Sequence, residues 1–443
     1  MDVTSHLPGH RRTPGTDPYL PGHGDDTYDV ESYALTLDYR VATNRLDGEA
    51  EVTLVTRTAL DRFELDLRGL EVSKVLVQGR RPAKYVTRGG RLRIQLVEAV
   101  PESHRLVVFV RYGGQPSPVR SAWGHVGWEE LSDGVIVAGQ PAGAPSWFPC
   151  NDRPGDKARY RITVTTESGY TVAANGQLAD HRRGASRSTW VFDQQEPMAS
   201  YLATVQIGQY QWLDLPDSGV PQHLLAGAGV ANAARLDLSE QPQMLSLFAE
   251  LFGPYPFPAY TVVVTDDELE IPLEAQGLSI FGSNHLDGSG QLNRLVAHEL
   301  AHQWFGNSLT VRRWSDIWLH EGFACYAEWL WSEHSGRASA HSLASKHHAE
   351  LADLDQDLVV ADPGIDLMFD DRLYKRGALV LHALRADLGD GAFFAMLREW
   401  VQDHRFGSIS TELFEEHTRR HGATDGLLAA WIHHPALPEL DRA

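Results

Sequence analysis

Cysteine is scarce in this sequence, which contains only Cys150 and Cys325 among 443 residues. Two thiols without CxxC spacing exclude a disulfide framework and are typical of a reducing compartment. We therefore expect a cytoplasmic protein in which both cysteines pack in the core. Long apolar runs are absent too: no segment approaches the roughly 18 apolar residues of a membrane span, and the start, MDVTSHLPGHRR, lacks the apolar stretch of a secretory signal.

Basic residues are outnumbered, with 39 Lys and Arg against 59 Asp and Glu, so the formal net charge is −20. A negative field of this size repels phosphate backbones, which excludes nucleic acid as an expected partner. The composition, 42% hydrophobic and 22% charged, is that of a folded globular protein. The length is sufficient for two or three domains, although the sequence does not reveal the oligomeric state.

The first half of the chain carries apolar residues at every second position, as at Tyr33, Leu35 and Leu37. This alternation predicts half-buried strands, with further strands expected at Phe63–Leu67, Leu92–Leu96, Leu106–Tyr112, Tyr160–Val164 and Trp190–Phe192. We predict an all-β domain over residues 25–214, preceded by an irregular arm over residues 1–24.

The second half, residues 215–443, has apolar residues at helical spacing and is predicted to be a mainly helical domain. Expected helices cover Ser239–Leu251, Leu292–Phe305, Asp316–Trp331, Leu379–Leu388, Ala392–Val401 and Thr411–His421. A small sheet is predicted from the strand-like segments Tyr260–Thr265 and Leu278–Phe281. We also expect a helix to end at Gly389 and another to be capped at its N-terminus by Ser410. The fold class is therefore α+β, in more than one domain.

One segment, Val296 to Asn307, contains the motif His-Glu-Leu-Ala-His. On a helix, His298 and His302 lie one turn apart, so both imidazoles can reach one Zn²⁺, and Glu299 lies beside them as a candidate general base. Because a short motif also arises by chance, its context has to decide.

A catalytic zinc ion commonly takes three protein ligands, the third often a carboxylate from a neighbouring helix. Glu321, in WLHEGFACYAE, is the candidate for that ligand. Glu328, seven residues later and on the same helical face, could hold a ligating imidazole in place. The alternative is that both are surface carboxylates of an amphipathic helix. His433 and His434 are interpreted as structural or surface residues.

These motifs resemble the aminopeptidase N family of gluzincin zinc peptidases, which also includes the bifunctional leukotriene-epoxide hydrolase/aminopeptidase. The likeness extends over HELAHQWFGN with Glu321, WFPCNDRPGDKARYRITV, EPMASYLATVQIGQY, GPYPFPAYTVVV, YKRGALVLHALR and WIHHPALP. It implies a saddle-like β domain followed by a thermolysin-like catalytic domain with one Zn²⁺ per chain. It also implies a short form, because many relatives continue beyond the WIHHPALP segment into a large helical domain.

The resemblance also implies roles for residues outside the zinc motif. Glu274 corresponds to the family's glutamate that binds the substrate's α-ammonium, and Gln140 to a second amine-binding position. Tyr374, which begins YKRGA just ahead of a predicted helix, corresponds to the tyrosine that stabilises the oxyanion. The strand Ile271-Pro272-Leu273-Glu274-Ala275 departs from the family's Gly-Ala-Met-Glu-Asn, and Pro272 cannot donate a backbone hydrogen bond to a substrate.

The sequence therefore predicts a zinc-dependent aminopeptidase acting on peptides with a free N-terminus, with Glu299 as general base. The altered strand leaves an endopeptidase or an epoxide hydrolase of the same class as the alternative. A catalytically silent peptide-binding scaffold is a third interpretation, which predicts damaged ligands, whereas His298, His302 and Glu321 are all intact. The preferred N-terminal residue and the physiological peptide are not readable from the sequence.

Overall fold

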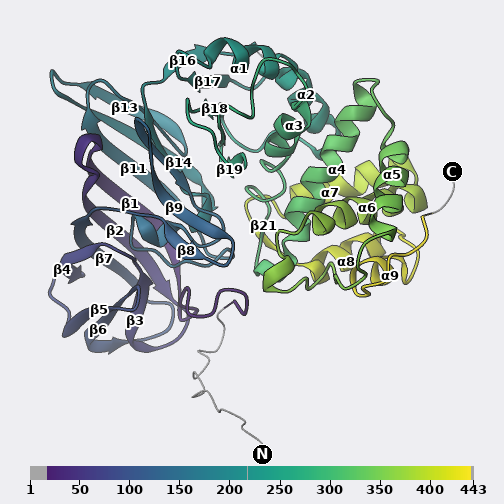
Figure 1. The fold of residues 1–443 in the computed structure, drawn as a ribbon. Coiled ribbons are helices and arrows are strands. Elements are labelled where there is room, and N and C mark those ends of the chain that lie inside the picture. The colour runs from purple at the N-terminus through teal and green to yellow at the C-terminus, as the bar shows by residue number, and fades with distance from the viewer. Residues whose placement is uncertain (1–16, 217, 441–443) are drawn as a thin grey trace, which may run out of the picture.

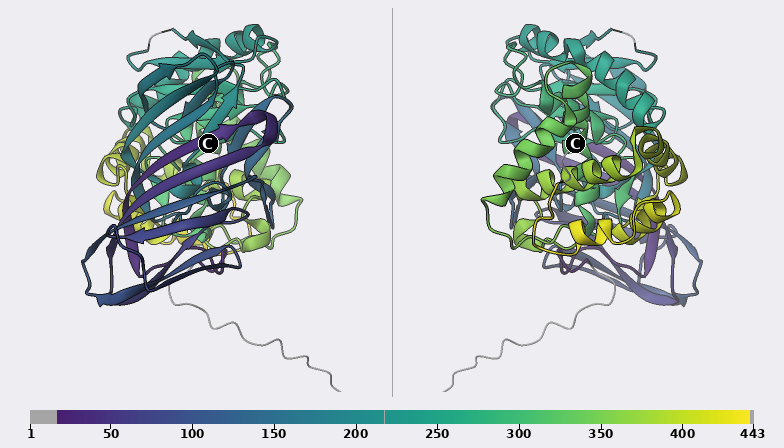
Figure 2. Two further views of the ribbon diagram at one scale, coloured as in Figure 1. Left: turned by 90° about the vertical axis from the view of Figure 1, so that its left-hand side faces the viewer. Right: turned by 90° about the vertical axis from the view of Figure 1, so that its right-hand side faces the viewer.

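The computed structural model describes residues 17–216 and 218–440. Within this range a β-rich N-terminal half stands beside a mainly helical C-terminal half (Figure 1). The two views of Figure 2 show the strands of the first half on one side of the molecule and the helices of the second half on the other. The predicted α+β order is confirmed. Residues 1–16 of the predicted arm lie outside the described residues.

The largest sheet of the N-terminal half has the strand order β13-β14-β11-β1-β2-β7-β4. Strands β1 and β11 run parallel and the other neighbours antiparallel. The predicted alternation is present: Tyr33, Leu35 and Leu37 are buried while the residues between them are exposed. The strands are β1 (Tyr28–Arg40), β2 (Arg45–Thr56), β4 (Glu71–Val77), β7 (Arg105–Gly114), β11 (Lys157–Glu167), β13 (Gln177–Arg183) and β14 (Arg187–Ala199).

Two smaller sheets complete this half. One has the order β12-β15-β10-β9-β8 and the other the order β3-β6-β5. Their strands are β3 (Leu60–Asp66), β5 (Lys84–Arg88), β6 (Arg91–Val100), β8 (Val119–Ser121), β9 (Gly124–Leu131), β10 (Gly134–Ala138), β12 (Thr171–Ala174) and β15 (Val205–Gly208).

The second half opens with a sheet of order β16-β17-β18-β20-β19, in which β17, β18 and β20 run parallel and β19 is an antiparallel edge strand. The strands are β16 (Gln211–Asp214), β17 (Gln222–Ala226), β18 (Tyr260–Val264), β19 (Leu273–Ala275) and β20 (Leu278–Phe281). The domain boundary after residue 214 stays a prediction, although β16, just before it, already pairs within this second sheet.

Helices α1 and α2 lie between β17 and β18 in the chain and the other helices follow the sheet, with α4 to α9 to the right of it in Figure 1. They are α1 (Ala231–Asp237), α2 (Gln241–Phe252), α3 (Asn293–Ala301), α4 (Trp318–His334), α5 (Ala340–Ala352), α6 (Asp371–Leu388), α7 (Asp390–Asp403), α8 (Thr411–Arg420) and α9 (Leu427–Ile432). Strands β21 (Thr310–Val311) and β22 (Ser408–Ile409) form a short parallel pair among them.

Two predicted helix bounds differ from the structure by four residues or more, and the other bounds of the predicted helices by at most three. Helix α3 ends at Ala301 instead of continuing to residue 305, and helix α6 begins at Asp371, eight residues before the predicted start at Leu379. The early start has a local cause, because the side chain of Asp370 accepts the backbone N–H of Arg372 and caps the helix. Tyr374 therefore lies within α6 and not ahead of a helix. Gly389 follows the end of α6 and Ser410 caps α8, as predicted.

The two halves are joined by a half-buried lysine. Lys157, at the start of β11, donates from Nζ to the backbone carbonyls of Asn307 at 3.0 Å, Ser308 at 2.8 Å and Gly407 at 3.4 Å. An ammonium group that is partly withdrawn from water needs such acceptors for its donors. Lys157 therefore ties the large sheet to the segment that directly follows the His-Glu-Leu-Ala-His motif.

Candidate active site

His298, His302 and Glu321 form a compact group at the junction of α3 and α4. Their nearest ligand atoms all lie within 4.8 Å of one another. Glu321 Oε2 is 3.4 Å from His298 Nε2 and 3.5 Å from His302 Nε2. Two imidazole nitrogens and one carboxylate oxygen are the donor set of many catalytic zinc sites, so these residues fit a zinc ion.

The other nitrogen of each imidazole has its own partner. His298 Nδ1 lies 2.8 Å from Glu328 Oε1, and His302 Nδ1 lies 3.0 Å from the backbone oxygen of Phe305. Both acceptors favour the tautomer with the proton on Nδ1, which leaves the Nε2 lone pairs directed to the side of Glu321. The group is thus oriented for a cation by contacts within the chain.

Burial would disfavour charge on Glu321, but the adjacent His302 and His298 outweigh it and hold its pKa well below the usual range. A carboxylate that stays ionised at low pH is suited to bind a metal ion.

The turn after α3 packs against α4 and sets the spacing of the ligands. The ring of Phe305 stacks on that of Phe323 with centroids 4.3 Å apart, two residues beyond Glu321. Helices α6 and α4 cross in close contact at Gly377 and Gly322. There is no room for a side chain between them, since a Cβ added to Gly377 would lie 2.7 Å from the Cα of Gly322. This crossing brings Tyr374, one turn before Gly377, to the ligand group.

Glu299 lies beside the ligands but is not one of them. It is buried, and its Oε2 has no hydrogen-bond partner among the described residues. Burial raises the pKa of Glu299 to about 7. A carboxylate with a free oxygen and a pKa near neutrality can both accept and release a proton.

Tyr374 is half-buried, and its ring lies nearly parallel to that of His298, with centroids 6.0 Å apart and planes inclined by 17°. Burial, together with the carboxylates of Glu321 and Glu274, raises the pKa of Tyr374. The side chain therefore remains a phenol, which can donate a hydrogen bond to a developing oxyanion.

Gln140 and Glu274 are hydrogen-bonded to each other, although they are 134 residues apart in the chain. Gln140 Nε2 donates to Glu274 Oε1 at 2.6 Å. Burial raises the pKa of Glu274, and nearby Glu321 adds to this shift while His302 opposes it. Glu274 thus lies within electrostatic reach of the ligand group, on the edge strand β19.

Two further residues, which sequence reasoning did not single out, hold β19 against the turn that follows α3. Gln303 Nε2 and Asn307 Nδ2 both donate to the backbone oxygen of Ala275, at 3.2 and 3.0 Å, and Gln303 Oε1 accepts the backbone N–H of Gly277. Both lie in the HELAHQWFGN segment. Their position next to the histidines in the sequence was the signal that could have identified them as residues of the site. They fix the distance between Glu274 and the ligand group.

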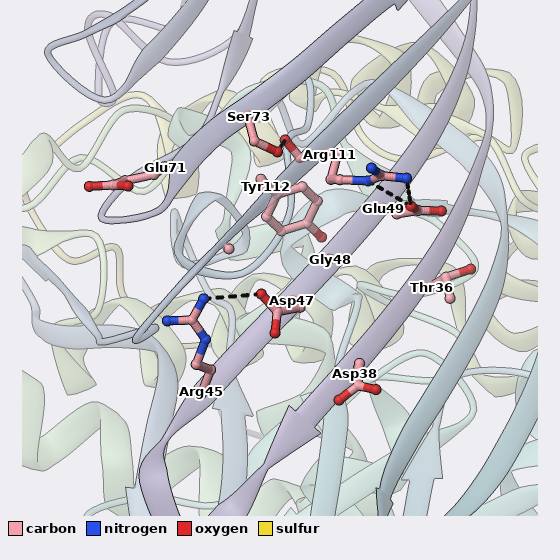
Figure 3. Close-up of a pocket in the computed structure, with 11 residues that line it drawn as sticks. Thr36, Asp38, Arg45, Asp47, Gly48, Glu49, Glu71, Ser73, Arg111 and Tyr112 are labelled. Atoms are coloured by element: carbon pink, nitrogen blue, oxygen red, sulfur yellow. Dashed lines mark hydrogen bonds and ion pairs between the residues drawn. The ribbon is translucent and has the colours of Figure 1, made fainter.

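A separate hollow of about 360 Å³ lies on the N-terminal half (Figure 3). Four of its charged side chains form two ion pairs: Arg45 with Asp47 at 3.3 Å and Arg111 with Glu49 at 2.7 Å. None of the predicted site residues lines it. This hollow is therefore not a continuation of the candidate active site.

The remaining residues considered in the sequence lie elsewhere. Cys150 and Cys325 are buried free thiols. His433 Nε2 pairs with Glu415 Oε1 at 2.8 Å, away from the ligand group. None of the helices within residues 17–216 and 218–440 has the length and hydropathy needed to cross a bilayer.

Comparison with known proteins agrees with this architecture. Residues 29–202 match the peptidase M1 N-terminal domain and residues 236–430 match the peptidase family M1 domain. The chain is 27% identical over 319 residues to aminopeptidase M1 of Arabidopsis thaliana, a match that covers 66% of this chain and 35% of the relative. It is 24% identical over 438 residues to probable aminopeptidase 1 of Sulfurisphaera tokodaii, covering 92% of this chain and 53% of the relative. The chain thus spans about a third to a half of these curated relatives.

A solved structure matches over almost its whole length. The M1 zinc metallopeptidase of Deinococcus radiodurans, in a variant bound to a Tyr-Ser-Ala substrate, is 28% identical, with a TM-score of 0.89 and coverage of 96% of this chain and 98% of that chain. The two family matches follow one another in the order of the two halves described above. This chain belongs to peptidase family M1.

Proposed function

We propose that this protein is a zinc-dependent aminopeptidase that removes N-terminal residues from peptides. The observation that supports it most strongly is the placement of Glu274, paired with Gln140, within electrostatic reach of the His298, His302 and Glu321 group. A metal-ligand group beside a half-buried glutamate combines a hydrolytic centre with a binding site for an ammonium group. The solved relative with a bound Tyr-Ser-Ala substrate is consistent with peptides as the substrate class.

In this proposal His298, His302 and Glu321 hold one zinc ion. Zinc, when bound, supplies Lewis-acid chemistry, because it acidifies water and polarises a carbonyl group. The role of Glu299 follows from its free Oε2, which accepts a proton from the attacking water and returns it to the amine that leaves.

Tyr374 donates its phenolic proton in a hydrogen bond to the oxyanion that develops from the carbonyl. Glu274 accepts hydrogen bonds from the α-ammonium of the substrate, and Gln140 orients the Glu274 carboxylate through the bond to Oε1. An ammonium group held at this fixed position places the first peptide bond, and no other, at the hydrolytic centre.

The decisive experiment offers a mixed library of short peptides to the zinc-loaded protein, in parallel with free and with N-acetylated termini, and follows the products by mass spectrometry. Stepwise loss of single residues from the free peptides alone supports the proposal. Equal internal cleavage of both pools would instead identify an endopeptidase.

Pro272, next to β19, is the observation that favours such an alternative, because it removes one backbone donor beside the edge strand that carries Glu274. Hydrolysis of an epoxide substrate without peptide cleavage would instead identify an epoxide hydrolase.

The two buried free cysteines also lead us to propose a cytoplasmic location. Fractionation of cells that express the tagged chain tests this part of the proposal directly.

A further inference from the structure

A second group of metal-binding side chains lies where α7 and α8 meet, and it shares no residue with the candidate active site. Glu399 on α7, His417 on α8 and His421 at the end of α8 have ligand atoms that all lie within 4.8 Å of one another. We propose that these three residues bind a divalent transition-metal ion of the zinc class. Two histidines one helical turn apart and one carboxylate form the same donor set as the group at α3 and α4.

The distance between a ligand atom of His421 and one of Glu399 is the distance expected between two ligands of a tetrahedral metal ion. His421 Nε2 lies 3.3 Å from Glu399 Oε1. Two ligands bound tetrahedrally at about 2.0–2.1 Å from zinc lie roughly 3.3 Å apart. The corresponding distances in the candidate active site, 3.4 and 3.5 Å, are almost the same.

The third ligand is held in a suitable orientation by the backbone. His417 is fully buried, and its Nε2 lies 2.9 Å from the backbone oxygen of Met396. Because a carbonyl can only accept, the ring proton is on Nε2, and Nδ1 keeps the lone pair with which it can bind a metal ion. A carbonyl that orients the outer nitrogen of a ligating histidine is a common feature of protein metal sites.

One cationic group competes with the metal ion. Arg420 Nη2 lies 3.3 Å from His417 Nδ1 and donates to its lone pair. The arginine is exposed, so its guanidinium can exchange this weak bond for water when a cation binds. The site is therefore expected to bind zinc more weakly than the candidate active site, and removal of the guanidinium is expected to strengthen binding.

Metal binding here would add a link between two helices that already meet through aromatic contacts, such as that of Trp400 with His417 at 5.2 Å between ring centroids, and through the hydrogen bond of His417 to Met396. An ion that binds only the folded state raises the stability of the protein with its concentration. The net charge of −20 also favours the approach of a cation. The expected consequence is a zinc-dependent increase in thermal stability that is separate from occupation of the candidate active site.

The test measures zinc bound per chain after equilibrium dialysis against buffers of increasing free zinc, on protein already loaded with its first zinc ion. Wild-type protein is expected to take up a second equivalent in the micromolar range. His421→Ala and Glu399→Gln should weaken this second binding by about tenfold or more, and Arg420→Gln should strengthen it by about tenfold.

His433→Ala is the matched control, because His433 also pairs with a glutamate, Glu415, but forms no three-ligand group with residues of the described ranges 17–216 and 218–440. This variant should bind the second equivalent as the wild type does. Uptake by His421→Ala and Glu399→Gln that equals the wild type would overturn the proposal, as would an equal loss in His433→Ala, which would indicate unspecific binding to surface histidines. Far-UV circular dichroism and the uptake of the first zinc ion show whether each variant is folded.

Discussion

Gln140 donates a hydrogen bond to the carboxylate of Glu274 at 2.6 Å, and this contact joins the β-rich half of the chain to the edge strand beside the candidate metal ligands. The pair places a neutral amide and a carboxylate together at the position where a substrate's ammonium group is expected. The amide adds no charge and leaves Glu274 as the anion that determines selectivity for free N-termini.

Glu274→Ala is accordingly expected to lower kcat/KM for free peptides by about 100-fold or more, because a charge-assisted hydrogen bond to the ammonium is lost. Gln140→Ala should cost about tenfold, mainly through KM, since it only removes the partner that orients Glu274. Steady-state kinetics on one dipeptide substrate measure both. Gln115→Ala, an exposed glutamine of the same half, is the control and should leave both constants unchanged. Equal losses for free and N-acetylated substrates in Glu274→Ala would contradict the assigned role.

Glu299→Gln should lower kcat by about 10³-fold while the protein keeps its zinc, because the carboxylate is adjacent to the ligand group without belonging to it. Turnover and metal content are measured on the same preparation. Loss of zinc from this variant would show that Glu299 acts on the metal and not on a proton.

Glu328→Ala is expected to show the opposite pattern. Its carboxylate lies 2.8 Å from His298 Nδ1, and removal of such a partner typically weakens metal binding by about 10- to 100-fold. Titration with a chelator should therefore remove zinc from this variant at lower chelator concentrations than from the wild type, with activity restored by added zinc. Unchanged zinc affinity would show that Glu328 does not support metal binding through His298.

Gly377→Ala should disturb both stability and turnover. A Cβ at this position would lie 2.7 Å from the Cα of Gly322, so α6 has to move away from α4 and carries Tyr374 with it. We expect a loss of about 1–3 kcal/mol in the free energy of unfolding, measured in urea, and a lower kcat. Gly391→Ala is the matched control, because a Cβ at this glycine of α7 meets nothing within 4 Å and should leave stability nearly unchanged. Equal effects of the two substitutions would exclude the close crossing as the cause.

The stability of the protein should depend on pH through Asp316, which lies just before α4. Burial raises the pKa of Asp316 from 3.8 to about 6, although its carboxylate accepts hydrogen bonds from the backbone and hydroxyl of Thr411. Because the folded state binds this proton more tightly than the unfolded state, the contribution of Asp316 to stability falls as the pH rises from about 4 to about 6 and is constant above.

Asp316→Asn removes this titration. Relative to the wild type, the variant should therefore gain about 2–3 kcal/mol in the free energy of unfolding between pH 4 and pH 7. Urea unfolding of both proteins at the two pH values gives the difference. A difference between variant and wild type that does not change with pH, or that changes in the opposite direction, would show that Asp316 is not protonated in the folded protein near pH 5.

The local part of the candidate site was readable from the sequence because it depends on spacing along one element. Residues four apart on a helix share a face, so His298 and His302 had to lie together, and the spacing of Glu321 and Glu328 placed both on one side of α4. The same holds for the strands, since the alternation of Tyr33, Leu35 and Leu37 has the period of a half-buried strand.

The tertiary structure decided what spacing cannot express. The backbone oxygen of Phe305 orients His302 only because α3 ends at Ala301, earlier than its apolar pattern indicated. Tyr374 reaches His298 because two glycines of different helices allow α6 to approach α4. Hydrophobic periodicity acts over a few residues, whereas backbone contacts between distant segments depend on how whole elements pack, and this packing set the geometry of the site.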